Sequence, residues 1–144
     1  MKILFFVPYP TEGASNRIRV EQFLPYLRSM GVGCRVRPFV NRPFFKILYL
    51  PSRYIEKFFW FVICTINRLF DILRAVRYDA IFIHREAYPF GGALIESILY
   101  RMGKHIIYDF DDAIFLPSTS KQNIYINRFK NPAKISSIIR MSKR

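Results

Sequence analysis

Acidic residues are scarce in this chain. Its 144 residues contain ten Asp and Glu against 23 Lys and Arg, which gives a formal net charge of +13. No acid occurs between Glu21 and Glu56, and none occurs from Ala113 to Arg144. A field of this sign favours anionic partners such as nucleic acid, acidic lipid head groups or phosphorylated compounds.

Cysteine and long hydrophobic runs are scarce as well. Cys34 and Cys64 have no metal-ligand spacing, which excludes a cysteine-based metal centre and indicates buried, reduced thiols. The N-terminus lacks a signal-peptide cleavage site. The longest apolar run, Phe58 to Ile66, is far shorter than the ~20 residues that span a bilayer. We therefore expect a cytoplasmic protein that can still contact the inner face of the membrane.

Strand-like and helical patterns alternate along the chain. Hydrophobic residues make up 51% of it, enough for a packed core and not for a disordered tail. Apolar runs predict strands at 2–7, 32–39, 79–84 and 104–109, and three-to-four spacing predicts helices near 20–30, 54–77, 94–102 and 134–141. Residues 38–52 read as a loop. This order favours an α/β fold with a Rossmann-like parallel sheet and flanking helices, over residues 1–116. Residues 117–144 form a basic, partly helical tail.

Three carboxylates stand together after the last predicted strand. Asp109, Asp111 and Asp112 fall within four consecutive positions, at the strand end where parallel sheets place their ligands. Asp111 and Asp112 are the candidate catalytic residues, and Asp109 is a candidate substrate ligand. The three could also bind a divalent cation, although no other metal site is expected. The alternative is an ordinary strand end with one Asp capping the next turn.

Two other strand ends carry candidate ligands for a substrate or phosphate. The loop after the first strand offers backbone N–H groups at a helix start, followed by cations, in Gly13, Ser15, Asn16, Arg17 and Arg19. It has neither P-loop nor dinucleotide-binding spacing, and the alternative is a capped loop with Ser15 or Asn16 as N-cap. Arg85 and Glu86 follow the third strand. His84 before them is expected to be a hydrogen-bonded strand-end residue.

The predicted helix at 54–77 is a candidate membrane contact. Its apolar side chains form a stripe at three-to-four spacing: Ile55, Phe58, Phe59, Val62, Ile66, Leu69, Phe70, Leu73 and Val76. The predicted contact residues are Lys57, Phe58, Phe59, Trp60 and Val62, with Arg53, Arg68, Arg74 and Arg77 as nearby cations. The alternative packs this helix on the sheet and covers its second apolar face with another element.

Four segments together resemble a known enzyme class. They are Lys2-Ile-Leu-Phe-Phe-Val-Pro-Tyr-Pro10, Gly13 to Leu27, Asp79 to Glu86, and Tyr108 to Phe115. Their order is similar to the N-terminal half of the two-Rossmann (GT-B) glycosyltransferases of the group-1 or family-4 class. The resemblance implies an acceptor-binding half, inactive alone, of an enzyme that moves a sugar from a nucleotide-sugar donor to a glycan or lipid-linked acceptor. The donor would be bound by a missing second domain or subunit. Asp111 stands where many members have a His.

Three alternatives stay open at this stage. The first is a non-catalytic subunit that recruits a two-chain glycosyltransferase to the membrane. The second is a haloacid-dehalogenase-like phosphatase, because an apolar strand followed by Asp109-x-Asp111 resembles the nucleophile and acid of that class. The third and least favoured is a nucleic-acid-binding protein, which the charge permits but for which no helix-turn-helix, zinc-finger or RNA-recognition signature is present.

Overall fold

The protein folds around one parallel β-sheet. The computed structural model describes residues 1–110 and 133–142. Four strands, β1 (Lys2–Val7), β2 (Gly33–Pro38), β3 (Ala80–His84) and β4 (His105–Asp109), pair in parallel in the order β2-β1-β3-β4. The four strands match the predicted ones to within two residues at either end. The predicted α/β fold with a Rossmann-like parallel sheet is therefore confirmed.

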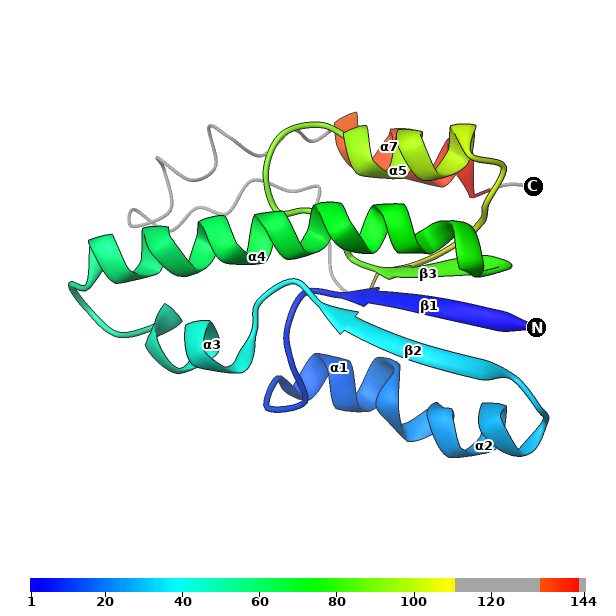
Figure 1. Ribbon diagram of the computed structural model, residues 1–144, viewed down its shortest axis with the longest axis horizontal. Coiled ribbons are helices and arrows are strands. Elements are labelled where there is room, and N and C mark those ends of the chain that lie inside the picture. The colour runs from blue at the N-terminus through cyan, green and yellow to red at the C-terminus, as the bar shows by residue number, and fades with distance from the viewer. Residues whose placement is uncertain (111–132, 143–144) are drawn as a thin grey trace.

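Helices cover both faces of the sheet (Figure 1). One face is covered by α1 (Ala14–Arg19), the short 3₁₀ turn η1 (Glu21–Phe23) and α2 (Leu24–Ser29). The other face carries α4 (Tyr54–Arg74), which continues into η2 (Ala75–Arg77), together with α5 (Leu94–Arg101) and α7 (Ala133–Met141). The helix α3 (Arg42–Leu48) lies between β2 and α4 in the chain and packs against α4.

Side-chain alternation along β1 explains this layering. Leu4 and Phe6 are buried on the α4 and α5 side, where they pack with Ile81 and Ile83 of β3. The neighbours of these two β1 residues, Ile3, Phe5 and Val7, are buried on the α1 and α2 side. A strand that is buried on both faces has a continuous apolar sequence, and β1 does.

The structure refines one local prediction and overturns another. Residues 21–29 are helical, as expected, but as η1 followed by α2, because Pro25 lies in the first turn of a new helix. Val20, the first residue of the expected helix, ends α1 outside the helical region (φ −129°, ψ −59°). The segment 38–52, expected as a loop, contains α3. Asn41 caps α3 by accepting a hydrogen bond from Phe44 N–H at 2.9 Å, and Phe44 and Ile47 are buried against α4. A cap and two buried residues outweigh the local loop composition.

The two thiols differ in burial. Cys34 and Cys64 are both free, but only Cys64 is buried as predicted, whereas Cys34 is half-buried; burial raises the pKa of each thiol above its ordinary value. A raised pKa keeps a cysteine in its unreactive thiol form.

Replacing Leu99 by Ala tests the core under α5. Leu99 is 0% exposed and Leu94, on the same helix, is 71% exposed. We expect Leu99→Ala to lower the free energy of unfolding by about 2–5 kcal/mol, because it leaves a cavity beside the sheet. Leu94→Ala should change it by about 0.5 kcal/mol or less. Urea unfolding measures both, and equal effects would show that α5 does not pack as described.

Candidate functional site

The carboxyl ends of the strands define the edge at which a ligand is expected. β1 and β3 are neighbours in the sheet, yet β1 leads into α1 on one face and β3 leads toward α5 on the other. Open parallel sheets bind ligands at such a switch point, outside the carboxyl ends of their strands. The last residues of β1, β3 and β4, together with the loops that follow β1 and β3, therefore surround the candidate site.

Asp109 is the centre of a charged group at this edge. Its Oδ2 lies 2.9 Å from Nδ1 of His84, whose side chain is completely buried at the end of β3. Its Oδ1 lies 3.4 Å from Nη2 of Arg19, and that same nitrogen donates a hydrogen bond to the carbonyl of Phe110 at 3.2 Å. The fold thus joins α1, β3 and β4 through one carboxylate, and it confirms the hydrogen-bonded strand-end role expected of His84.

Arg85 has an unusual backbone conformation beside this group. Its φ is +64°, in the left-handed region that non-glycine residues rarely adopt. Two hydrogen bonds hold it there: its N–H donates to the carbonyl of Asp109 at 2.7 Å, and its carbonyl accepts from Tyr108 Oη at 2.9 Å. A strained conformation costs on the order of 1–3 kcal/mol, and such residues concentrate at functional sites. Burial, followed by the charge of Glu86, raises the pKa of the Tyr108 phenol.

Glu86 belongs to a second charged group, behind the edge. Its Oε2 lies 3.2 Å from Nζ of Lys134 in α7, and Lys134 also lies 3.9 Å from Oε1 of Glu96. Glu96 is buried in α5 and accepts the N–H of Ala87 at 3.0 Å. Sequence reasoning missed Glu96 and Lys134. The available signal was a single acid between the apolar residues of α5.

The loop after β1 is held in place mainly by contacts among its own residues. A Cβ at Gly13 would lie 2.7 Å from Cβ of Tyr9, so a side chain at position 13 would displace this loop. Gly13, and not Ser15 or Asn16, is the N-cap of α1. Arg17 donates from Nη1 to the carbonyls of Thr11 and Glu12, at 3.0 and 3.2 Å, and so fastens the loop.

Asn16 and Ser15 complete this segment. Asn16 is buried and donates from Nδ2 to Glu21 Oε1 at 2.8 Å, and its Oδ1 has no hydrogen-bond partner within the described part of the chain. Ser15 is half-buried in the first turn of α1. Of the predicted ligands, Arg19 and Asp109 pair at the strand ends, and the backbone of Arg85 is bonded to Asp109. Glu86 pairs instead with Lys134 in the second charged group. The other four, Gly13, Ser15, Asn16 and Arg17, belong to the loop after β1 and the start of α1. That any of them binds a substrate stays a prediction.

Tyr9 connects the β1 loop to the residues after β3. Burial, together with a hydrogen bond to Tyr49, raises its pKa to about 12, and the charges of Arg85 and Glu86 act on it with opposite signs. Its phenol is therefore neutral at physiological pH. Sequence reasoning did not identify Tyr9 as a site residue.

The predicted catalytic pair lies outside the described residues. Asp111 and Asp112 follow β4 within the segment 111–132, so their catalytic role and a cation at Asp109, Asp111 and Asp112 stay predictions. Among residues 1–110 and 133–142, no three His, Cys, Asp or Glu side chains are grouped so that they could hold a metal ion.

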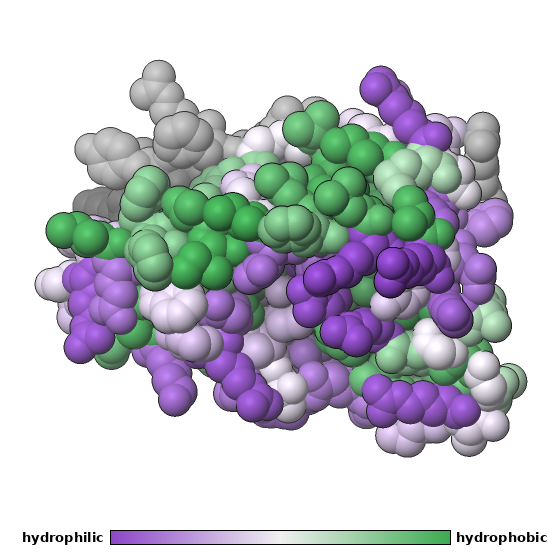
Figure 2. All heavy atoms as spheres, in the orientation of Figure 1, coloured by the Kyte–Doolittle hydropathy of each residue, from purple (hydrophilic) through white to green (hydrophobic). Residues whose placement is uncertain are grey.

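The apolar stripe of α4 faces solvent. Ile55 is 88% exposed, and the other eight members of the predicted stripe are exposed as well. The opposite face of α4 is the buried one, with Cys64, Arg68, Asp71 and Ile72. Figure 2 shows hydrophobic side chains gathered over α4 and α5. In the part of the chain that the structure describes, no helix is long and apolar enough to cross a membrane.

The predicted membrane-contact residues divide between two faces of α4. Phe58, Phe59 and Val62 belong to the exposed stripe. Trp60 is half-buried beside α3, and Lys57 donates from Nζ to the carbonyl of Leu50 at 2.6 Å.

The predicted cations near α4 also differ in exposure. Arg53, Arg74 and Arg77 are exposed. Arg68, which was expected with them at the surface, is buried, because its guanidinium stacks on the ring of Phe6 at 4.1 Å.

Replacing Asp109 by Ala tests the charged group at the strand ends. The change removes the acceptor of both His84 and Arg19, so we expect the free energy of unfolding to fall by about 1–3 kcal/mol. Glu12→Ala is the matched control, because Glu12 pairs with Arg42 at 3.0 Å but both side chains are exposed. It should cost about 1 kcal/mol or less. Urea unfolding of the two variants decides this, and a smaller loss for Asp109→Ala than for Glu12→Ala would refute the role of Asp109.

Comparison with known proteins gives limited similarity. No protein-family model matches the chain, and no curated protein matches it. A solved structure of a 2-deoxyribosyltransferase from Bacillus psychrosaccharolyticus is similar at 19% identity and a TM-score of 0.41, over 94% of this chain and 90% of that one. A similarity at this level assigns no activity to the present chain.

These findings correct the assignment made from the sequence. The similar solved structure is that of a 2-deoxyribosyltransferase and not of a two-Rossmann glycosyltransferase, and no family model supports the latter. The assignment to the acceptor-side half of a GT-B glycosyltransferase, with its sugar-transfer function, is therefore wrong. The alternatives of a glycosyltransferase subunit, a haloacid-dehalogenase-like phosphatase and a nucleic-acid-binding protein gain no support either. In the described part of the chain, the segments that carried the resemblance contain β1, β3, the end of β4, the helix α1 and most of α2, which are elements that many α/β proteins share.

Proposed function

We propose that this protein binds the surface of an anionic membrane through α4. The observation that carries the proposal is the exposed apolar stripe, which runs from Ile55 to Val76 along the whole helix. Proteins that stay in water rarely expose a contiguous apolar surface of this kind, and those that do use it to bind a partner or a membrane.

The shape and chemistry of α4 suit a bilayer interface. An interfacial helix lies in the plane of the membrane, with its apolar face among the upper acyl chains and its cations near the head groups. Phe58 and Phe59 lie on the apolar face, and Arg53 and Arg74 are exposed near the two ends of the helix. Burying each large apolar side chain contributes about 1.5–3 kcal/mol, so a few of them suffice for reversible binding.

The charge of the chain favours anionic lipid over neutral lipid. A net charge of +13 is attracted to the negative surface potential of acidic bilayers. Each basic residue close to such a surface contributes about 1 kcal/mol, and salt screens this attraction. A protein partner of α4 would need a complementary apolar groove, and its binding would not depend on acidic lipid.

The double variant Phe59→Glu with Val62→Glu tests this proposal. The two side chains are 60% and 38% exposed on the stripe. Their replacement should reduce co-sedimentation with phosphatidylserine-containing vesicles at least tenfold, because two apolar groups that the bilayer would cover become charged. Wild-type binding should be weaker to phosphatidylcholine vesicles and should fall with added salt.

A matched control is available on the other face of the sheet. Ile18 and Phe23 are 60% and 51% exposed beside α1, and Ile18→Glu with Phe23→Glu makes the same change in charge. This control should bind vesicles nearly as well as the wild type. Equal losses in the two double variants would contradict a role for α4. Wild-type protein that forms a dimer, and that Phe59→Glu with Val62→Glu converts to a monomer, would instead assign the stripe to a second copy of the chain.

A further inference from the structure

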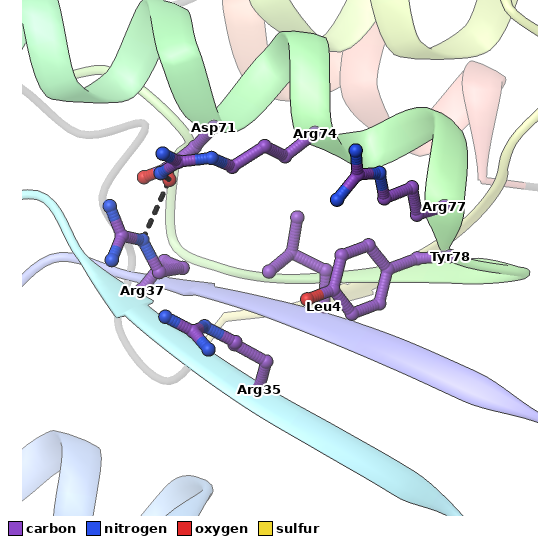
Figure 3. Close-up of a pocket in the computed structure, with 7 residues that line it drawn as sticks. All are labelled: Leu4, Arg35, Arg37, Asp71, Arg74, Arg77 and Tyr78. Carbon is purple, nitrogen blue, oxygen red and sulfur yellow. Dashed lines mark ion pairs between the residues drawn. The ribbon is translucent and has the colours of Figure 1, made fainter.

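A cavity rich in arginine lies between β2 and the end of α4. Its volume is about 310 Å³, and it is lined by Leu4, Arg35, Arg37, Asp71, Arg74, Arg77 and Tyr78. Arg35 and Arg37 extend from β2, and Arg74 and Arg77 approach from the opposite side (Figure 3). The cavity lies beside the middle of the strands β1 and β2 along their length, since Arg35 is in register with Leu4. It is therefore separate from the strand-end site.

The positive charge around this cavity exceeds the negative charge. Asp71 is its one acidic lining residue, and Oδ1 of Asp71 lies 2.7 Å from Nε of Arg37 and 3.9 Å from Nη1 of Arg74. Oδ2 of Asp71 lies 3.9 Å from Nη1 of the buried Arg68. One carboxylate thus faces three guanidinium groups.

Arg35 and Arg77 add further to the excess of positive charge around the cavity. Neither side chain forms an ion pair with any residue among 1–110 and 133–142. Five guanidinium groups, with Arg68 included, are therefore opposed by one carboxylate. Like charges at this density repel each other, and a bound anion would relieve that repulsion.

Arg68 fixes the carboxylate from behind. It is 1% exposed, and its Nη2 donates to the carbonyl of Arg37 at 3.2 Å. Burial lowers its pKa to about 10, while the charge of Asp71 acts to raise it. Arg68 is therefore charged at neutral pH, and it neutralises part of the negative charge of Asp71. Arg37, Arg68 and Asp71 have a structural role, which Arg35 and Arg77 do not share.

We infer that this cavity binds a phosphate-bearing ligand, with Arg35 and Arg77 as its principal contacts. Planar guanidinium groups match the oxygen geometry of phosphate in paired hydrogen bonds. Four of them around one cavity suit a group with two or more negative charges, such as a diphosphate or a phosphate monoester. The apolar side chain of Leu4 and the ring of Tyr78 can contact the remainder of the ligand.

The location of the cavity suggests two sources for the phosphate. Hydrophilic side chains lie next to the apolar side chains of α4 on one face of the molecule (Figure 2). The cavity would therefore be accessible both to a phosphomonoester lipid head group and to a soluble phosphate compound. The inference about phosphate does not depend on membrane binding by α4.

Calorimetric titration with inorganic pyrophosphate tests the inference. We expect saturable binding by the wild type and at least tenfold weaker binding by Arg35→Gln with Arg77→Gln, because two charged contacts are lost. Neither arginine forms an ion pair within the described structure, so the variant should fold, which its circular dichroism and melting temperature will verify. Arg28→Gln with Arg101→Gln is the matched control, with the same loss of charge outside the cavity lining.

The outcomes are distinct. No saturable binding by the wild type to either pyrophosphate or phosphatidic acid vesicles, or equal losses in the two double variants, would overturn the inference. A soluble ligand predicts that Arg35→Gln with Arg77→Gln loses pyrophosphate and keeps vesicle binding. A lipid ligand predicts a larger loss on phosphatidic acid vesicles than on phosphatidylglycerol vesicles of equal surface charge. Phe59→Glu with Val62→Glu should keep pyrophosphate binding, which separates this inference from the membrane proposal.

Discussion

The contact between Asp71 of α4 and Arg37 of β2 determines how the longest helix is oriented. A buried charge must be paired, because an isolated one loses its hydration without compensation. Asp71, Arg68 and Arg37 satisfy that requirement together only when the polar side of α4 faces the sheet. Rotating α4 so that its apolar stripe packed inward would bring these charges to the surface and separate Asp71 from Arg37. The ion pairs and the stripe therefore specify opposite sides of one helix.

Two surfaces result from this orientation. The apolar stripe faces solvent along α4, and four arginines from β2 and the end of α4 surround a cavity next to it. The same carboxylate that attaches the helix also holds Arg37 at the cavity wall. Attachment of α4 and assembly of the cavity are thus parts of one electrostatic arrangement. A partner of the stripe would supply apolar contact, and a partner of the cavity would supply negative charge.

The candidate residues at the strand ends were predicted in part. The rule that parallel sheets place ligands at their carboxyl ends led to Arg19, Arg85 and Asp109, which the structure brings into contact at one edge. The pairing of Asp109 with His84 and of Glu86 with Lys134 could not be read from the chain, since 25 and 48 residues separate the partners. The cavity arginines had a signal that was not recognised. Arg68, Asp71, Arg74 and Arg77 recur every third residue, and Arg35 and Arg37 alternate on a strand.

Strand positions and the long amphipathic helix follow from the sequence alone, because local periodicity encodes them, and the alternation of strands and helices indicates the parallel sheet. Tertiary structure decided which side of α4 is buried and where α3 forms. Periodicity shows that a helix has two faces, but it does not show which face meets the sheet. That choice depends on Arg37, which is 34 positions before Asp71 in the chain and reaches it only after β2 has paired with β1. In the same way, α3 is stabilised because Phe44 and Ile47 pack in one buried cluster with Cys64 of α4, a contact that no local sequence pattern predicts.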